Sequence, residues 1–553
     1  MKKILSLVLA LCMLFTCVAA LAEDATVGGL AANWWVDADL AKSETFYVDD
    51  GLTISMVGVH YNQYPTTFDG GYYFPSIEKM TNVHWDIDWR TSDGWATVVS
   101  TILAGGVDNL PDVIQVYSGA GVSISQLVDE GAIIALDDYL DLIPNVVAAV
   151  GEDRISSWAS ADGHIYNIPT IVNVPGSQSM TYRKDWALKL KEMGVIDFET
   201  PETWEQWLAF WYGVRDNDVN GNGDASDEIP LVLEMGESGE RCLHALLNAF
   251  GIKASNDAQF CVLDDGTYTM VYEHPNYRAF LEAVQKLYAD GIIDPEFVTR
   301  KQADMYQTMS ANICASCFTW AQMSQTHTEE LWAAGVEDAI FECCAPITGP
   351  YGDSYLQERA AVSPLNCITV KALQDGKVED ILKFYNWQFS EEGINLYNYG
   401  IEGLSYTLVD GQPTLNTEIV QNGFTDYRTL GMECEPFGGM WETSAFMQCL
   451  FAGETLENLN AAYQSFWNGL NNEGVNAGHY YPMPPTLETS AYSEYRGELI
   501  IGSTGVCTIR DQAIAGQLTV DEFFAKYEEL KDAGLAEVIE EGTEAYAQMV
   551  GGN

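Results

Sequence analysis

The sequence is poor in positive charge. Lysine and arginine account for 26 of its 553 residues, against 80 aspartates and glutamates, so the formal net charge is −54. Proteins that bind nucleic acid or anionic lipid neutralise phosphate with basic patches. The composition therefore predicts no nucleic-acid partner. The negative electrostatic field of the protein also disfavours a polyanionic ligand at long range, although the positive charge of Arg90 or Arg183 could offset this repulsion locally.

Long hydrophobic runs are missing beyond the N-terminus. A transmembrane helix needs about 20 apolar residues, and the apolar run near the start, residues 4–15, is shorter. Lys2 and Lys3 precede this run and Ala20-Leu21-Ala22 follows it, a pattern typical of a secretory signal peptide. We therefore predict that residues 1–22 are removed and that the mature protein is secreted.

A lipid anchor is the alternative to release. Residues 14–17, Leu-Phe-Thr-Cys, partly match a lipobox, in which the cysteine carries the lipid. Phe15 and Thr16 stand where small residues are favoured, so cleavage after Ala22 is the preferred prediction. Lipidation of Cys17 would instead hold the protein at the outer cell surface.

Cysteine patterns that mark a metal site are missing. Cys12 and Cys17 lie in the leader, so ten of the twelve cysteines remain after cleavage. Cys314 and Cys317 have the spacing of a zinc-binding pair, but no second pair matches it. Most of the ten lie in apolar surroundings, which favours buried thiols. Disulfides, which export would permit, stay open.

Several enzyme motifs are also missing. The chain has no nucleophile elbow, no His-Glu-x-x-His helix and no phosphate-binding loop. A glycoside hydrolase needs only two carboxylates about 5–10 Å apart across a sugar site. Because the chain has 80 acidic residues, a secreted glycoside hydrolase stays open as an alternative.

What the sequence does have is a run of oxygen-bearing side chains at residues 216–230, Asp-Asn-Asp-Val-Asn-Gly-Asn-Gly-Asp-Ala-Ser-Asp-Glu-Ile-Pro. Calcium takes about six to eight oxygen ligands, and glycine supplies the positive φ of a tight curl. The EF-hand pattern fits from Asp216 or from Asp218, and we prefer Asp218 because two carboxylates then close the ring. The predicted ligands are the side chains of Asp218, Asn220, Asn222, Asp227 and Glu228 and the carbonyl group of Asp224.

The ion would be structural, because one such loop without a paired partner does not suit signalling. The alternative is a polar surface loop whose Asn-Gly pairs only make turns. Trp204, Trp207 and Trp211 precede the loop on one predicted helical face, and Thr200 and Pro201 suit a helix start. We interpret this tryptophan face as core rather than as a sugar-binding surface.

The loop resembles the calcium loop of large extracellular solute-binding proteins of carbohydrate ABC transporters, the oligosaccharide- and alginate-binding lipoprotein type. Residues 290–297 and 398–403 carry further resemblance, and one extra residue before Asp227 departs from the family's pattern. The resemblance implies a monomeric protein that captures an oligosaccharide, delivers it to membrane permease subunits and catalyses no reaction. A neutral sugar is preferred over an acidic sugar or a peptide.

The fold class that the resemblance implies is α/β, a two-lobed periplasmic-binding-protein-like (type II) fold with a hinge and an interlobe cleft. Strands that alternate with helices between residues 52 and 136 agree with a parallel sheet. The first lobe is predicted at residues 44–172 plus 342–398. The second is predicted at residues 173–341 plus 399–553.

Candidate ligand-binding residues follow from these expectations. Ligands of α/β sheets bind at the carboxyl ends of strands, and aromatic faces suit sugar rings. The candidates are Tyr61, Arg90, Trp95 and Ser118 in the first lobe and Trp320, Tyr399 and Trp441 elsewhere.

Overall fold

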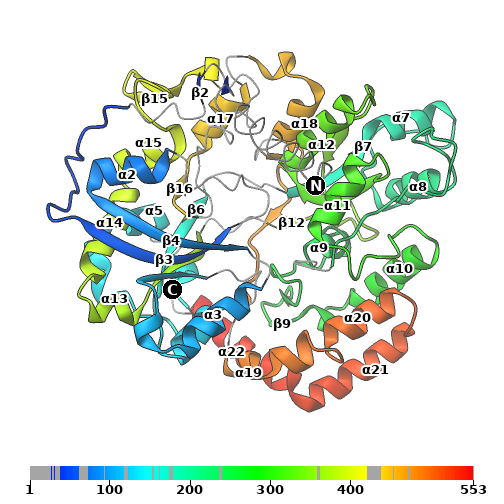
Figure 1. Ribbon diagram of the computed structural model, residues 1–553. Coiled ribbons are helices and arrows are strands. Elements are labelled where there is room, and N and C mark those ends of the chain that lie inside the picture. Colours follow the sequence, from blue (N-terminus) through cyan, green and yellow to red (C-terminus); the bar gives the residue numbers. More distant parts are fainter. Residues whose placement is uncertain are drawn as a thin grey trace, which may run out of the picture. The chain divides into compact units, whose positions relative to one another are not determined.

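The computed structural model describes most of the chain (Figure 1). The described ranges are 26–27, 30–31, 38–60, 72–91, 94–116, 122–151, 155–160, 162–172, 178–235, 240–357, 362–419, 437–451, 454–470, 474–487 and 489–551. The predicted signal peptide, Cys17, Tyr61 and Ser118 lie outside them. None of the helices in these ranges is both long enough and apolar enough to cross a membrane.

The chain divides into two compact units. Unit 1 is Met1–Asn173 with Ala361–Thr455, and unit 2 is Val174–Ala360 with Leu456–Asn553. This division differs from the predicted lobes at two segments. Residues 342–360 fall in unit 2, because β11 (Phe341–Cys344) pairs with β7 (Gln178–Arg183) there. Residues 399–455 fall in unit 1, because a two-residue strand at 440–441 joins the sheet of that unit.

Unit 1 is built on a six-stranded mixed sheet with the order β16-β6-β13-β5-β3-β4. The parallel part that the sequence predicts is present, since β3 pairs in parallel with both β4 and β5. Strand β13 is antiparallel to β5 and β6. The strands are β3 (Leu52–His60), β4 (Val83–Thr91), β5 (Val113–Gln115), β6 (Asn167–Val172), β13 (Val362–Ile368) and β16 (Met440–Trp441).

The two faces of this sheet bury different side chains. On one face, Val57 and Val59 share a core with Trp95 and Val99 of α3. On the other, Trp85 makes edge contacts with aromatic rings of α14, Phe384 among them. The α-helices in the described part of unit 1 are α2 (Tyr73–Thr81), α3 (Trp95–Ala104), α4 (Ile124–Asp129), α5 (Pro144–Val150), α6 (Ile155–Trp158), α13 (Val370–Gln374), α14 (Val378–Gln388), α15 (Glu391–Tyr399) and α17 (Thr443–Phe451), with a hairpin of β14 (Tyr406–Val409) and β15 (Gln412–Leu415).

Unit 2 has a three-stranded antiparallel sheet with β7 in the centre, flanked by β10 (Ser316–Trp320) and β11. Two short pairs accompany it, β8 (Phe260–Val262) with β9 (Tyr268–Met270) and β12 (Leu356–Gln357) with β17 (Tyr480–Tyr481). Its helices are α7 (Lys184–Glu192), α8 (Trp204–Arg215), α9 (Glu240–Ala249), α10 (Tyr277–Ala289), α11 (Gln302–Ser310), α12 (Ala321–Ala333), α18 (Ala461–Leu470), α19 (Ser490–Tyr495), α20 (Val506–Ile514), α21 (Val520–Leu530) and α22 (Ala536–Gly551).

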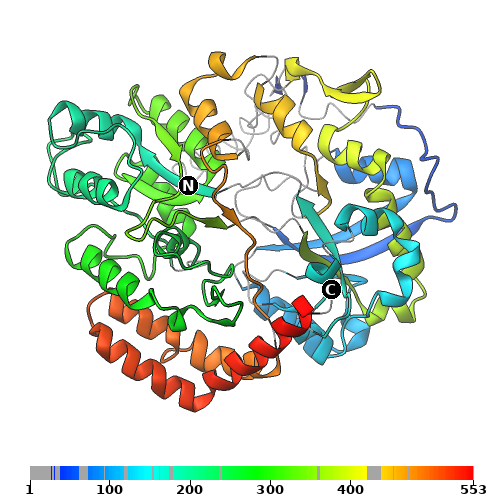
Figure 2. The ribbon, with the colours of Figure 1, turned by 180° about the vertical axis from the view of Figure 1, so that it is seen from behind.

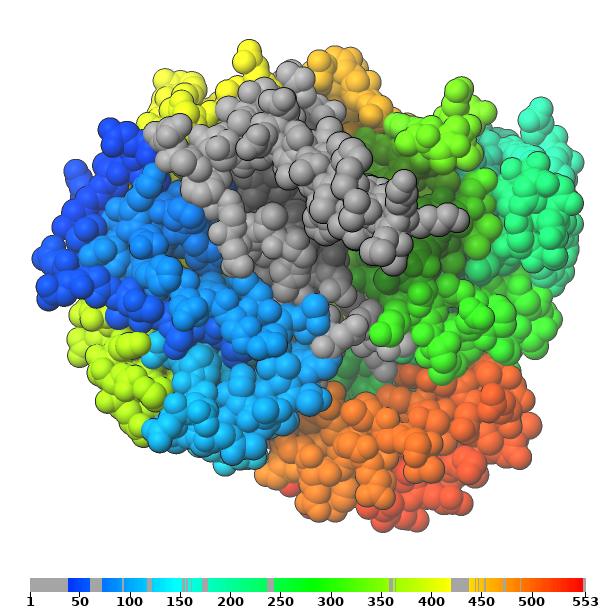
Figure 3. Space-filling view, in the orientation of Figure 1, coloured from blue at the N-terminus to red at the C-terminus, as the bar shows by residue number. Residues whose placement is uncertain are grey.

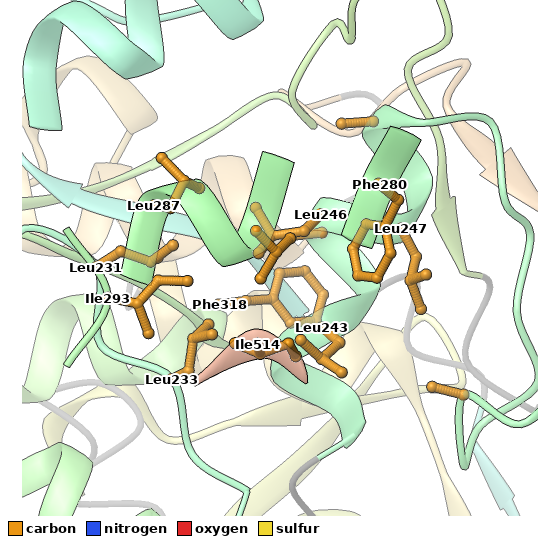
Figure 4. Close-up of a cluster of buried hydrophobic side chains, with 14 of the residues drawn as sticks. Leu231, Leu233, Leu243, Leu246, Leu247, Phe280, Leu287, Ile293, Phe318 and Ile514 are labelled. Carbon is orange, nitrogen blue, oxygen red and sulfur yellow. The ribbon is translucent and has the colours of Figure 1, made fainter. Parts of the chain in front are cut away.

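An extended core of unit 2 surrounds its sheet and contains residues from both faces, such as Cys317 and Phe318. Phe318 of β10 packs among leucines of α9, and Phe280 and Leu287 of α10 close the cluster (Figure 4). The C-terminal helices extend this core, and Gln285 of α10 donates to the Ala513 carbonyl of α20 at 2.6 Å. In the space-filling view they form an orange-red surface directly below the green one (Figure 3), and they lie against α10 again from behind (Figure 2).

The tryptophan face of α8 is buried, which confirms its interpretation as core. Trp207 and Trp211 have no exposed surface. The helix begins one turn later than Thr200 and Pro201 predicted, because Thr203 caps it and forms a capping box with Gln206. Burial of thiols is also seen: the cysteines with described side chains are buried and form no disulfide, namely Cys261, Cys314, Cys317, Cys343, Cys344, Cys367, Cys449 and Cys507.

One hydrogen bond distinguishes two equally buried tryptophans of α8. The Trp211 indole donates to the Ser316 hydroxyl at 2.9 Å, whereas the Trp207 indole nitrogen has no hydrogen-bond partner. We expect Trp211→Phe to lower the free energy of unfolding by about 1 kcal/mol more than Trp207→Phe, the usual net value of one buried hydrogen bond. Chemical denaturation of both variants measures the difference. Equal losses would show that the Ser316 bond contributes nothing.

Candidate functional site: an acidic loop and an aromatic sheet edge

Both ends of the predicted calcium loop are held by regular structure. Helix α8 leads into it, and its last residue, Arg215, is followed by Asp216 as the C-cap. At the other end, the Ile229 amide donates to the Ile313 carbonyl at 2.8 Å, and the Ala315 amide donates to the Ile229 carbonyl at 2.9 Å. The loop is therefore closed between the tryptophan helix and the start of β10.

One carboxylate organises the curl of the loop. Asp218 accepts the Gly221 amide through Oδ1 at 2.7 Å and the Gly223 amide through Oδ2 at 2.9 Å. Gly221 has φ of +77° and Gly223 has φ of +94°, the left-handed region that favours glycine. These two glycines thus have the conformational role that the sequence predicted.

A second carboxylate gathers the two asparagines. Asp227 accepts the Asn220 side-chain amide through Oδ1 at 3.1 Å and the Asn222 amide through Oδ2 at 2.5 Å. Glu228 accepts the Asn220 backbone amide through Oε1 at 3.0 Å. The structure therefore connects Asn220 and Asn222 with both closing carboxylates.

Asp224 behaves differently from the other predicted ligands. Its carboxylate accepts the backbone amide of Ser226 at 3.0 Å and its hydroxyl at 2.6 Å. The hydroxyl bond is the main cause that lowers the pKa of Asp224. Its side chain is thus occupied within the loop, which agrees with a ligand role for the carbonyl group alone.

The environment of Glu228 indicates whether the oxygen atoms of the loop suit a cation. The side chain is buried, burial raises the pKa of its carboxyl group, and Oε2 has no hydrogen-bond partner. A buried carboxylate oxygen without a partner is costly, and a hard cation would satisfy it. The other donors are carboxylate and amide oxygens, the class that calcium prefers, so the residues present fit calcium.

The carboxylates of the loop do not converge on one point. Among the described residues, no three His, Cys, Asp or Glu side chains come together as a metal-binding group. The reason lies in the hydrogen bonds above, because Asp218 and Asp227 accept amide groups. An ion would have to replace some of these amide contacts.

Lys189 makes a contact with the loop that was not predicted from the sequence. Its Nζ donates to the carbonyl groups of Asp218 at 3.1 Å and Val219 at 2.9 Å. Lys189 belongs to α7 and precedes Asp218 by 29 residues. No local pattern in the sequence signals this contact, since it depends on how α7 packs beside α8.

The first-lobe candidates for solute binding lie in different environments. Arg90 is exposed on β4 and pairs with the Asp88 carboxylate at 2.6 Å. Trp95 has no exposed surface and lies in the core beneath β3. The structure therefore places the Trp95 ring in the packing of unit 1, where it does not offer a face to a ligand.

Tyr399 and Trp441 lie close together in unit 1 and are both buried. The Trp441 indole donates to the Tyr397 hydroxyl at 2.6 Å, and the Tyr399 hydroxyl bonds to that of Ser444. Burial is the main cause that raises the pKa of Tyr399. Both rings are therefore buried in the packing of unit 1 and do not present open faces.

Trp320 is the candidate with a partly exposed ring, at the end of β10. It is the residue directly before α12 and lies opposite Gln178 of β7 in the antiparallel pair. The carboxyl ends of β10 and β11 both lie at this end of the sheet, where β7 begins, because both strands are antiparallel to β7. Two of the three strands therefore end here, as the strands of parallel α/β sheets do where they bind ligands.

Comparisons with known proteins found one similar sequence and many similar folds. No protein-family model matches the chain. The fructooligosaccharide ABC transporter substrate-binding protein FusA of Streptococcus pneumoniae is 29% identical over 232 residues. That alignment covers 40% of this chain and 41% of FusA, so it spans less than half of the relative's length.

The solved structures show the fold. The alginate-binding protein AlgQ2 without calcium ion has a TM-score of 0.69 at 20% identity, covering 91% of this chain and 100% of that one. An EF-hand mutant of Streptococcus pneumoniae FusA in complex with fructo-nystose has a TM-score of 0.66 at 19% identity, with coverage of 91% and 100%. The two-lobed α/β fold class and the resemblance to carbohydrate solute-binding proteins are thereby confirmed.

Proposed function

We propose that this protein, which resembles carbohydrate solute-binding proteins, is the extracellular solute-binding component of an ABC importer. It captures an oligosaccharide and delivers it to the membrane permease subunits. The observation that carries the proposal is the sequence similarity to a fructooligosaccharide substrate-binding protein. The relatives are substrate-binding proteins rather than enzymes, which supports the prediction that the chain catalyses no reaction.

A neutral sugar fits the described side chains better than an acidic one. A uronate would need an available cation, and the two basic residues considered from the sequence, Arg90 and Arg183, are already paired. Arg90 contacts Asp88 at 2.6 Å, and the buried Arg183 contacts Asp185 at 2.6 Å. The partly exposed ring of Trp320 offers an apolar face that suits a pyranose or furanose ring.

The proposal includes a calcium ion in the loop at residues 216–230. Two proteins of this fold support it, since AlgQ2 was solved without calcium ion and FusA was solved as an EF-hand mutant. Asp218, Asn220, Asn222, Asp227 and Glu228 would hold the ion, with the carbonyl group of Asp224. The ion would neutralise the carboxylates and cross-link the end of α8 to the segment that precedes β10.

The location and assembly follow from the same class of protein. Substrate-binding components of importers work outside the cytoplasmic membrane, which agrees with the predicted signal peptide. Release after residue 22 or a lipid at Cys17 would both place the protein there. We propose that it works as a monomer.

The function is tested by incubation with sugars. We expect neutral oligosaccharides such as kestose or fructo-nystose to raise the melting temperature, because a ligand that binds only the folded state stabilises it. Chromatography should then recover the sugar unchanged. Cleavage of the sugar would favour the glycoside hydrolase instead, and stabilisation only by uronates or peptides would contradict a neutral ligand.

Trp320→Ala should weaken oligosaccharide binding by roughly 1–3 kcal/mol, the scale of losing one large apolar contact. The melting temperature of the free protein should change little because the ring is partly exposed. Calorimetric titration measures the affinity, and Trp320→Tyr, which keeps an aromatic face, should retain most of it. A large loss of stability at unchanged affinity would assign Trp320 to the core.

Removal of calcium should destabilise the protein. An ion at a hundredfold excess over its Kd stabilises the folded state by about 2.7 kcal/mol, so chelation should lower the melting temperature and added calcium should restore it. Magnesium should restore it poorly, because it prefers a small octahedral shell and keeps its waters. Thermal unfolding with and without each ion measures this.

Asp218→Ala should abolish this calcium response while leaving sugar affinity within a few-fold. Asp265→Ala is the matched control, because Asp265 is an exposed aspartate that accepts a turn amide, Thr267, outside the loop. Loss of sugar binding on chelation without unfolding would place the ion in the sugar site and contradict its structural role.

A further inference from the structure

A row of three uncharged amide side chains leads to Trp320 in unit 2. The Asn248 side chain of α9 donates to the Gln357 side chain of β12 at 3.4 Å, and Gln357 donates to the Gln178 side chain of β7 at 3.3 Å. Gln178 is the cross-strand partner of Trp320. We call Asn248, Gln357 and Gln178 the amide row (its elements α9, β12 and β7 are labelled in Figure 1).

The amide row runs from the interior to the edge of the sheet. Asn248 has no exposed surface, and its Oδ1 is buried without a hydrogen-bond partner. Gln357 and Gln178 are half-buried. Because each amide donates to the next, the row ends in the Gln178 Nε2 group, which donates to no described residue.

The backbone of Gln178 is held as well as its side chain. Asn476, fully buried, donates through Nδ2 to the Gln178 carbonyl at 3.4 Å and to the Gly469 carbonyl at 3.1 Å. Buried polar groups that serve only packing are usually fully hydrogen-bonded. This network instead keeps an orphaned oxygen at Asn248 and an available donor at Gln178.

The available donor lies beside the aromatic ring. Directly opposite residues of an antiparallel pair project from the same face of the sheet, so Gln178 and Trp320 flank the same space. An aromatic face binds the apolar side of a sugar ring, while a planar amide binds its hydroxyl groups. These hydrogen bonds of the amide row join only uncharged amide and carbonyl groups.

We propose that Gln178 is a hydroxyl-binding, specificity-determining residue beside Trp320, and that Gln357 is the positioning residue that orients its amide. The row offers hydrogen bonds without charge, so it selects a neutral sugar over a uronate. This inference rests on the proposed function and adds to it the residues that recognise the solute.

The test is calorimetric titration with kestose, and with maltotriose and an alginate oligosaccharide as further probes. Gln178→Ala should weaken binding of the neutral sugar about tenfold, the effect of losing a hydrogen bond worth about 1.4 kcal/mol. Gln357→Leu keeps a similar volume and should weaken it less. Gln285→Ala, a half-buried glutamine bonded to carbonyl groups between α10 and α20, is the matched control and should bind as the unsubstituted protein does.

The double variant separates positioning from structure. If Gln357 acts through Gln178, Gln178→Ala with Gln357→Leu should bind no more weakly than Gln178→Ala alone. Additive losses, or losses that track the melting temperature, would overturn the positioning role. Unchanged affinity in Gln178→Ala while Trp320→Ala is impaired would overturn this inference alone. No binding of any neutral sugar, or preference for the alginate oligosaccharide, would overturn it together with the proposed function.

Discussion

The Ser316 hydroxyl links three segments of unit 2 through two hydrogen bonds. It accepts the Trp211 indole at 2.9 Å and donates to the Pro230 carbonyl at 2.6 Å. A single side chain therefore joins the tryptophan helix, the residue that ends the acidic loop and the first residue of β10. Because β10 ends at Trp320, the strand that carries the proposed sugar-binding ring is held at its start by the proposed calcium loop.

This connection would link the proposed structural ion, at the start of β10, to the proposed binding surface at the end of the same strand. The loop carries several carboxylates, and their repulsion opposes the tight curl that residues 216–230 adopt. At present amide donors offset that repulsion, as at Asp218 and Asp227. A cation would offset it more strongly and leave the strand start fixed. The sugar would then meet a sheet edge that is already ordered, which lowers the entropic cost of binding.

Local patterns predicted local structure well and long-range pairing poorly. The curl at Gly221 and Gly223, the buried tryptophan face and the parallel strands β3 and β4 follow from spacing and backbone preference. The lobe boundaries could not be predicted in this way. They depend on strands as short as β16, whose two residues carry no periodic signal. Lys189 and the amide row were missed for the same reason, since each joins elements far apart in the sequence.

The most direct measurement is a crystal structure of the protein with calcium and a neutral oligosaccharide bound. We predict a sugar ring against Trp320, a hydroxyl group within hydrogen-bond distance of Gln178 Nε2, and the ion enclosed by Asp218, Asp227 and Glu228 without touching the sugar. A sugar bound away from Trp320, or an ion that ligates the sugar directly, would contradict this prediction.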